Sequence, residues 1–334
     1  MKRPLLWVLR TIVVGLAVAA VVCGLLASRF LQTPVAPSGE QQVRIAAGTP
    51  LLRIAAQLER HGIVSNGRGF VLLARWQGLA GQVQAGEYLF VEPARPAEVL
   101  HRLVSGDVRM VRYTFPEGLS LKETAARIAT AGLASESEVM ELLNDTELAR
   151  RYQIPATSLE GYLFPETYTL RSDSNAAELV TAMLEQSRRH LTPELLTAAA
   201  ARGLDRHQLV ILASIIQKEA GHDAEMPLIA AVFHNRLRRG MPLQADPTVI
   251  YGIADFDGNL TRKHLATPTP YNTYQMRGLP AGPIASPGSI ALHATAHPAE
   301  TDALYFVSRG DGSHVFSKTL SEHNRAVRRY QLGR

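Results

Sequence analysis

Cysteine is nearly absent from this sequence, because Cys23 is the only one in 334 residues. A single thiol cannot form a disulfide within the chain, so an exported domain must depend on its apolar core for stability. Cys23 also lies inside an apolar run near the N-terminus. Cysteine-based zinc sites and thiol catalysis are therefore excluded from the rest of the chain.

Acidic residues are absent before Glu40, whereas four basic residues lie in that stretch. They carry +4 of the formal net charge of +5, so the remaining chain is close to neutral. A nucleic-acid-binding protein carries its basic surface on the folded part, so this distribution argues against that class. Hydrophobic residues make up 46% of the chain and charged residues 19%, which suits a sizeable core in one or two domains.

The longest apolar run is TIVVGLAVAAVVCGLLAS at residues 11–28, and Phe30 and Leu31 extend it. At 1.5 Å per residue, a helix over 11–31 crosses a hydrocarbon core of ~30 Å. Three basic residues precede the run and one follows it, so the positive-inside rule places residues 1–10 in the cytoplasm and the rest of the chain outside. A cleaved signal peptide is the alternative, but the run is long for one and ends without a small-x-small site.

Residues 32–43 form a linker rich in Pro, Ser and Gln, and a weak internal repeat follows it. GTPLLRIAAQLERHGIVSN at 48–66 aligns without a gap with GLSLKETAARIATAGLASE at 118–136. Each copy predicts a helix, a glycine turn and a second helix between strand-like segments. Such units can be packing modules without a site. They also resemble the LysM-like modules of wall-associated proteins, which contact glycans.

Residues 151–334 predict a larger domain with several helices. Thr319 and Glu322 form a capping box, and Asp246 and Ser286, each followed by proline, are expected N-caps. ALYFVSRGDGSHVFS predicts two strands joined by a glycine-containing turn. The segment 261–285 has little regular pattern, and such a long loop in a compact domain is usually functional. Helical patterns occupy 175–201, 206–220, 224–239, 287–296 and 320–331.

Glu219 ends the helix that is expected to start near Asp205. Leu209, Leu212 and Ile216 recur at the spacing of a buried face, and Glu219 lies at the edge of that face. Partial burial and the negative end of the helix dipole both raise the pKa of a carboxyl group, which a general acid needs near neutral pH. The alternative is an ordinary surface glutamate paired with a basic residue.

The segments after Glu219 supply side chains that suit sugars, because aromatic rings stack on sugar faces and amides bind hydroxyl and N-acetyl groups. Asp246 has the alternative role of a helix cap, and the tyrosines have the alternative of packing beneath the long loop. The candidate substrate contacts are Asn235, Gln244, Asp246, Tyr271, Asn272 and Tyr274.

Five segments carry the most specific pattern in the sequence: LEGYLFPETY (159–168), ASIIQKEA (213–220), AVFHNRLRRGMPLQADPTVIYG (231–252), TPTPYNTYQMRGLPAGPIASPG (267–288) and HPAETDALYFVS (297–308). Together they resemble the endolytic murein transglycosylases, the YceG-like (MltG) family. The similarity runs from about residue 44 to 331. The family's EKE motif appears here as Gln217-Lys218-Glu219, which keeps the family's catalytic glutamate at 219 and removes a neighbouring acid.

The resemblance implies an α+β fold: an N-terminal transmembrane helix, a LysM-like α+β module over 44–150, and a mixed α/β catalytic domain over 151–334 that has several helices and a C-terminal β-hairpin. It implies non-hydrolytic cleavage of the β-1,4 bond between N-acetylmuramic acid and N-acetylglucosamine in peptidoglycan strands. Glu219 would act as acid and then base, with no cofactor. The enzyme would be a single-pass protein of the cytoplasmic membrane with an extracytoplasmic (periplasmic) catalytic domain, and would limit strand length beside peptidoglycan synthases.

Glu160 in LEGYLFPETY is the best second acid, either orienting substrate or fixing a turn before Gly161. A muramidase that hydrolyses the same bond with Glu219 and Glu160 or Asp246 is an alternative enzyme, and a non-catalytic wall-binding scaffold is an alternative class. No metal site is expected, because His222 and His234 lack a third ligand at a recognisable spacing. Lys218 lacks the nearby phosphate-binding glycine motif of a Schiff-base lysine.

Overall fold

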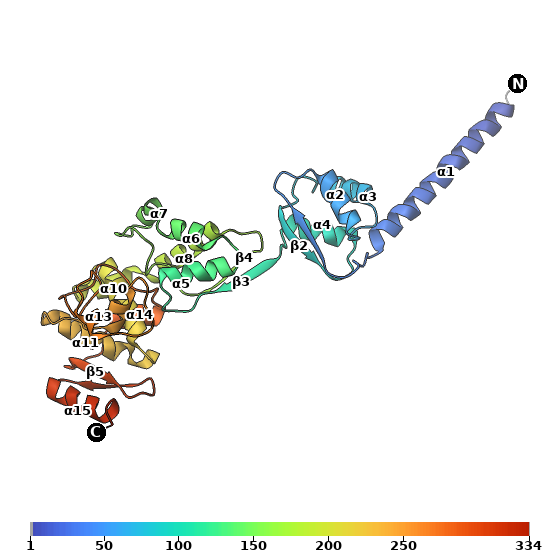
Figure 1. Cartoon of the computed structure of the whole chain (residues 1–334). Coiled ribbons are helices and arrows are strands. Elements are labelled where there is room, and N and C mark those ends of the chain that lie inside the picture. Colours follow the sequence, from blue (N-terminus) through green and yellow to red (C-terminus); the bar gives the residue numbers. More distant parts are fainter. Residues whose placement is uncertain (1–2, 334) are drawn as a thin grey trace. The chain divides into compact units, whose positions relative to one another are not determined.

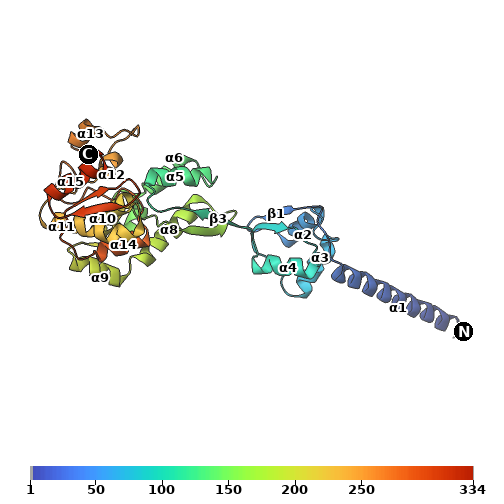
Figure 2. The same ribbon diagram turned by 90° about the horizontal axis from the view of Figure 1, so that it is seen from below.

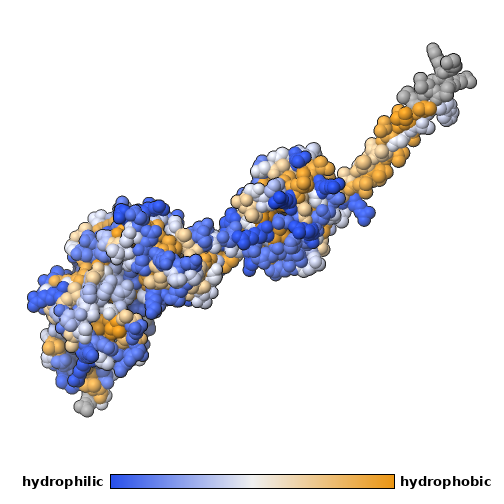
Figure 3. Space-filling model, turned by 45° about the horizontal axis from the view of Figure 1, so that its top comes forward, coloured by the Kyte–Doolittle hydropathy of each residue, from blue (hydrophilic) through white to orange (hydrophobic). Residues whose placement is uncertain are grey.

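The apolar run near the N-terminus forms helix α1 (Arg3–Gln32) in the computed structural model, which describes residues 3–333 (Figure 1). The segment Arg10–Gln32 is long and apolar enough to cross a membrane, and none of its most hydrophobic stretch is buried. Figure 3 shows a largely apolar surface along this helix. Its length, composition and exposure are compatible with the predicted membrane span.

The described chain divides into two units. The N-terminal unit runs to Val111 and includes Thr169–Asp173, and the C-terminal unit holds Arg112–Tyr168 and the chain from Ser174 onward. The chain passes from one unit to the other in two short strands that pair with each other, β3 (Met110–Thr114) and β4 (Thr167–Arg171).

The N-terminal unit builds its fold on a two-stranded antiparallel sheet. Strand β1 (Gln41–Ile45) pairs with β2 (Gly86–Phe90). Helix α2 (Leu51–Arg60) packs on β1 and on α3 (Gly67–Trp76), which in turn packs on α4 (Pro96–Ser105). Each helix has one apolar face, so the three helices and the sheet enclose a single core.

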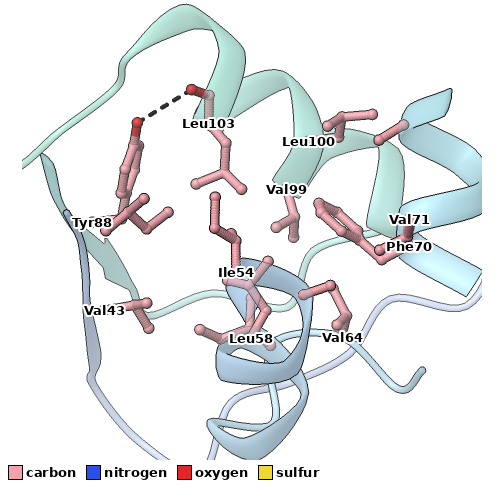
Figure 4. Close-up of a cluster of buried hydrophobic side chains, with 14 of the residues drawn as sticks. Val43, Ile54, Leu58, Val64, Phe70, Val71, Tyr88, Val99, Leu100 and Leu103 are labelled. Atoms are coloured by element: carbon pink, nitrogen blue, oxygen red, sulfur yellow. Dashed lines mark hydrogen bonds between the residues drawn. The ribbon is translucent and has the colours of Figure 1, made fainter. Parts of the chain in front are cut away.

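Figure 4 shows that side chains from these strands and helices meet in this core. Leu58 and Phe70 are fully buried, and so is Tyr88. The hydroxyl of Tyr88 donates to the backbone carbonyls of Gln84, 2.8 Å away, and Leu103, 3.2 Å away. A buried hydroxyl without a partner would cost free energy, so these bonds let a tyrosine serve as a core residue.

Both copies of the internal repeat fold as a helix, a turn and a second helix, as predicted. The first copy contains α2 and α3, and the second contains α5 (Leu121–Thr130) and α6 (Glu136–Leu143). Ser120 and Ser135 open the second pair, each in a capping box with a glutamate three residues later. The first copy lies in the N-terminal unit and the second in the C-terminal unit. The likeness of either copy to a LysM module stays a prediction.

The rest of the C-terminal unit is mainly helical and ends in a β-hairpin and a helix. Its elements after α6 and outside β4 are α7 (Thr146–Arg151), α8 (Ala176–His190), α9 (Pro193–Ala201), α10 (Arg206–Glu219), the 3₁₀ turn η1 (Asp223–Glu225), α11 (Met226–Arg238), α12 (Asp246–Tyr251), α13 (Arg262–Ala266), α14 (Ser289–Ala296), β5 (Tyr305–Ser308), β6 (His314–Ser317) and α15 (Leu320–Tyr330).

Helix α10 is the central element of this unit, because α9, α11, α12 and α14 all pack on it. Figure 2 shows α10, α11 and α14 side by side. Strands β5 and β6 are antiparallel with Phe306 opposite Phe316, and α15 packs on both strands. The predicted hairpin is confirmed, and so is the capping box of Thr319 and Glu322 at the start of α15.

Three predicted helix boundaries are wrong, one of them the N-cap at Asp246, because Ala245 holds that position. The pattern at 175–201 is two helices, because Pro193 cannot continue α8 and instead begins α9. Ser286 is not an N-cap, since Gly288 holds that position and α14 begins at Ser289. Between these helices the expected loop 261–285 contains only the short helix α13.

The core of the N-terminal unit yields a stability prediction on one helix. Leu58→Ala removes a fully buried side chain of α2 and leaves a cavity, so it should lower the free energy of unfolding by about 2–5 kcal/mol. Leu52→Ala on the same helix, where the residue is 63% exposed, should change it by less than about 0.5 kcal/mol. Urea denaturation of the full chain measures both, and equal effects would contradict this core.

Candidate active site

Glu219 is the last residue of a helix that is buried along most of its length. Asp205 caps the start of α10 by accepting a hydrogen bond from the backbone N–H of Gln208 at 2.8 Å. The eight residues from Leu209 to Ile216 are all buried. Because neighbouring elements pack along most of α10, the position of its last turn is fixed, and so is the position of Glu219 at the edge of the core.

The turn after α10 is held close to the β5–β6 hairpin. A Cβ atom on Gly221 would lie 2.2 Å from the carbonyl oxygen of Gly312 in the hairpin turn. Only glycine permits this approach, because no backbone shift of that size is cheap. The end of α10 and the hairpin therefore form two sides of one cleft.

The Glu219 cleft has a volume of about 480 Å³. Glu219 is half-buried in its wall. Side chains from α11, from the start of α12, from the long loop, from the hairpin and from α15 and its C-terminal end complete the lining. The polar side chains that line it with Glu219 are Arg236, Gln244, Asp246, Tyr274, Tyr305, Ser308, His314, His323 and Gln331.

Burial, together with the nearby negative charge of Asp246, raises the pKa of Glu219 to about 8. The positive charge of Arg236 acts in the opposite direction but is the smallest of the three causes. Among the residues that the structure describes, no group donates a hydrogen bond to the Glu219 carboxyl. The group therefore holds a proton at neutral pH and has both oxygens available to a ligand.

Asp246 faces the cleft and is not an N-cap, so that alternative is wrong. Ala245 holds the cap position of α12 and Asp246 is the first helical residue. Its carboxylate accepts a hydrogen bond of 2.6 Å from the hydroxyl of Tyr274. The bond and burial both raise the pKa of Tyr274, so the phenol keeps its proton and serves as a donor.

Arg236 is a buried cation, and two of its three guanidinium nitrogens donate to protein groups. Its guanidinium donates to the carbonyls of Leu304 at 2.7 Å and Leu243 at 2.6 Å, and lies 5.3 Å from the ring centroid of Tyr305. It also approaches the side-chain oxygen of Gln244 at 3.5 Å. Gln244 has φ 53, a left-handed conformation that is uncommon for a residue with a side chain. This backbone turns the exposed Gln244 side chain into the cleft.

His314 is a cleft residue that the sequence analysis missed. Its Nδ1 lies 2.7 Å from a carboxylate oxygen of Glu225, and its backbone N–H donates to the other oxygen at 2.9 Å. The sequence singled out His222 and His234 instead. His234 is buried with Nε2 2.8 Å from the carbonyl of Thr295, and no group of metal ligands occurs among residues 3–333. Only the glycine-containing turn before His314 hinted at its position.

A second cleft has a volume of about 840 Å³. Lys218 and Pro247 line the second cleft, whereas their chain neighbours Glu219 and Asp246 line the first. Both clefts therefore take part of their lining from the end of α10 and the start of α12. Ser120, Lys122, Tyr251 and Phe256 are among the other residues of the second cleft, and its buried acid is Glu160.

Glu160 differs from Glu219 because its oxygens are already hydrogen-bonded. One oxygen accepts from the backbone N–H of Leu121 at 2.9 Å and from the hydroxyl of Tyr251 at 2.8 Å, and the other from the backbone N–H of Gly161 at 3.2 Å. Burial nevertheless raises the pKa of Glu160 to about 7. The carboxyl ties the start of α5 to the end of α12, so the turn-fixing role expected before Gly161 is present.

Three of the predicted substrate contacts lie away from the first cleft. Asn235 is buried, donates to the carbonyls of Thr301 and Ala303 at 2.8 Å each, and accepts from Arg238. Asn272 is fully buried, and its amide group donates to three backbone carbonyls of the segment 264–267. These two amides brace the fold and are not available to a substrate.

Tyr271 packs against Tyr251, with ring centroids 4.7 Å apart. Because Tyr251 donates to Glu160, Tyr271 supports the wall of the second cleft and does not line the Glu219 cleft. The predicted set therefore divides: Gln244, Asp246 and Tyr274 are gathered around Glu219, and Tyr271 belongs with Glu160.

One protonated carboxyl beside a second acid and a tyrosine, in a cleft of this kind, is the arrangement of a general acid–base enzyme. The chain belongs to the YceG-like family, whose sequence model matches residues 43–329. The resemblance found from the motifs is thus confirmed.

Relatives of the chain are named endolytic murein transglycosylases. One from Bacillus subtilis is 33% identical over 304 residues, covering 86% of this chain and 84% of the relative. One from Streptococcus pneumoniae is 27% identical over 317 residues, covering 85% of this chain but 57% of the longer relative. A crystal structure of a YceG-like protein from Listeria monocytogenes aligns with a TM-score of 0.60 and 30% identity, covering 86% of this chain and 98% of the other.

The division between bracing and cleft residues yields a test. Asn235→Ala removes the side-chain donor to the buried carbonyl of Ala303 and the part-buried carbonyl of Thr301, so it should lower the free energy of unfolding by about 1–3 kcal/mol. Gln244→Ala, at an exposed position of the cleft, should change stability by less than about 0.5 kcal/mol. Thermal and urea unfolding of the two variants provide the comparison. If the Asn235 variant were as stable as the parent, the bracing role would be contradicted and Asn235 would again be a candidate substrate contact.

Proposed function

We propose that this chain is a membrane-anchored lytic transglycosylase that cleaves the β-1,4 bond between N-acetylmuramic acid and N-acetylglucosamine within peptidoglycan strands. The reaction uses no water and leaves a 1,6-anhydro-muramoyl end. The observation that carries the proposal is the Glu219 carboxyl, which has a pKa of about 8 and no internal hydrogen-bond donor among the described residues. The names of the relatives supply the substrate class.

Glu219 acts twice in this mechanism. Its carboxyl proton passes to the glycosidic oxygen as the bond to C1 breaks, and the leaving sugar departs as an alcohol. The resulting carboxylate takes the proton from the C6 hydroxyl as that oxygen attacks C1 and closes the anhydro ring. The glutamate ends protonated again, so no water has to be activated and no second catalytic carboxyl is needed.

Asp246 is the group best suited to stabilise the positive charge that develops at C1. Its negative charge already acts on Glu219, which means that it lies within electrostatic reach of the same space. The hydrogen bond from Tyr274 holds its orientation. Gln244 and Tyr274 are proposed as contacts for hydroxyl and N-acetyl groups.

The second cleft is proposed to hold further sugars of the same strand. An enzyme that cuts within a strand must bind sugar on both sides of the bond that breaks. Lys218 and Pro247 of the second cleft are the chain neighbours of Glu219 and Asp246 of the first, which supports one path along both clefts. Tyr251 lines that path with its orientation fixed by its hydrogen bond to Glu160 and by packing against Tyr271.

Hydrolysis of the same bond is the second candidate function, and Asp246 is the observation that favours it. A carboxylate near a protonated carboxyl is the pair that an ordinary glycosidase uses, one as acid and one to activate water or to form a covalent intermediate. The products separate the two reactions, because an anhydro end is lighter than a reducing end by one water.

Anchoring by α1 would keep the active site near newly made strands. Three basic residues before the span and one after it support an N-terminus in the cytoplasm and a periplasmic, or otherwise extracytoplasmic, catalytic unit of the cytoplasmic membrane. In that location the enzyme would end strand elongation beside peptidoglycan synthases.

The catalytic role of Glu219 predicts the effect of one substitution. Glu219→Gln removes the proton donor and should reduce cleavage of purified peptidoglycan strands by ~100-fold or more, with binding of strands retained. Glu117→Gln is the matched control, because this carboxyl also has a pKa raised by burial but lines neither cleft. Mass spectrometry of the glycan fragments that the full-length enzyme releases from peptidoglycan should show anhydro ends. Reducing ends alone would favour hydrolysis, and an inactive parent that binds strands would favour a scaffold.

The protonation state of Glu219 predicts a pH profile. Its acid form is required first, so the turnover rate should be full below its pKa and fall as the pH rises through about 8. Asp246→Asn removes a negative charge that raises the pKa, so the fall should move to lower pH in this variant. Turnover of defined glycan fragments from pH 5 to 10 gives both profiles. An unchanged alkaline limb in the variant would contradict the electrostatic coupling.

A further inference from the structure

The outward face of α3 is unusual for a helix in an exported unit. Leu72 is 67% exposed and Trp76 is 80% exposed. Arg68 and Arg75 are exposed as well. These four positions follow the i, i+4, i+7, i+8 spacing of a single helical face, opposite the face that enters the core. The α3 face, as we call these four residues, therefore joins two large apolar side chains with two positive charges.

The α3 face lies directly beside the end of α1. Phe30 and Leu31 of α1 pack against the core of the N-terminal unit. A Cβ atom on Gly69 of α3 would lie 3.2 Å from the ring of Phe30, so the two helices are in close contact. Leu72 and Trp76 line one groove of about 780 Å³ together with side chains of α1 from Leu26 to Leu31.

This contact fixes the level of the α3 face along α1. The apolar segment Arg10–Gln32 has 23 residues, which at 1.5 Å each is longer than a hydrocarbon core of ~30 Å. Residues 26–31 are its last turns, so they lie where the hydrocarbon gives way to the headgroups. Antiparallel pairing of Val35 with Ala94 ties down the chain just beyond, which leaves little freedom for the unit to move away.

The composition of the α3 face matches a lipid headgroup region. Tryptophan prefers this region because its ring is apolar and its N–H is polar, and arginine is attracted to anionic lipids. Arg29 of α1 joins Arg68 in lining the groove, and no acidic residue lines it among the described part of the chain. If this surface faced water, Leu72 and Trp76 would expose a large apolar area to solvent, which is unfavourable.

We propose that the α3 face is a membrane-binding surface, which inserts Leu72 and Trp76 into the headgroup region and binds acidic phospholipids through Arg68 and Arg75. The proposal rests on the membrane anchoring proposed above. The N-terminal unit would then be attached to the membrane at two places, through the span of α1 and through the α3 face, and would lie on the bilayer surface.

Tryptophan fluorescence provides the test, because the chain has only Trp7 and Trp76. The full chain with Trp7→Phe is reconstituted at one copy per nanodisc, with acidic phospholipids and with bromine at either a shallow or a deep position of the acyl chain. Trp76 should lose most of its emission with shallow bromine and less with deep bromine. Aqueous iodide should quench it little.

A charge-reversed variant tests the headgroup contacts. Arg68→Glu with Arg75→Glu should reduce quenching by shallow bromine and restore quenching by iodide, more so in acidic than in neutral lipid. Arg53→Glu is the matched control, because it reverses an exposed arginine of α2 that does not line the groove. Circular dichroism checks that each variant is folded.

Three results would overturn the proposal, and they differ from one another. Iodide quenching without bromine quenching would mean that the α3 face is in water. Emission shielded from both quenchers would mean that protein covers this surface, either another part of the chain or a second copy. Failure of the chain to elute with nanodiscs would overturn the anchor together with this inference, whereas the cleavage reaction would stand.

Discussion

The burial of the Glu219 carboxyl at the end of α10 is the constraint on which the site depends. Eight successive buried residues hold the helix, and the close approach of Gly221 to Gly312 holds the turn that follows it. Burial and, to a smaller extent, the negative charge of Asp246 raise the pKa of the carboxyl to about 8, and the positive charge of Arg236 opposes them only in part. Burying this group lowers the stability of the fold but keeps a proton on a carboxyl that would ionise in water.

Two buried carboxyls in one unit show why hydrogen bonding separates a reactive acid from a bracing one. Glu160 and Glu219 both have a raised pKa, about 7 and about 8, because desolvation is the largest influence on each. Glu160 accepts three hydrogen bonds from the protein, two of them from backbone N–H groups. Glu219 has no such donor among the described residues, so its interactions are left for the substrate. That difference supports the assignment of the acid–base role to Glu219.

Local patterns in the sequence predicted a good part of this structure. The spacing of Leu209, Leu212 and Ile216 indicated the buried face of α10, and the capping box of Thr319 and Glu322 marked the start of α15. Such local patterns could not predict which distant segments of the chain contact one another. Asn235 looked available for sugar binding, but its partners are Thr301 and Ala303, more than 60 residues away in the sequence. His314 was missed for the same reason, since its pairing with Glu225 joins the hairpin to the η1 turn. Asp246 looked like a cap until its partner in the long loop, Tyr274, was visible.

The central claim is that Glu219 is protonated at neutral pH, and a direct titration of this one group tests it. The carbon-13 chemical shift of the Glu219 carboxyl can be followed against pH in the full chain with labelled glutamate, with the signal assigned by its absence in Glu219→Gln. The account predicts a midpoint near 8, well above the ordinary glutamate value of ~4.3. A midpoint at the ordinary value would contradict it, because Glu219 would then have no proton to give to a glycosidic oxygen.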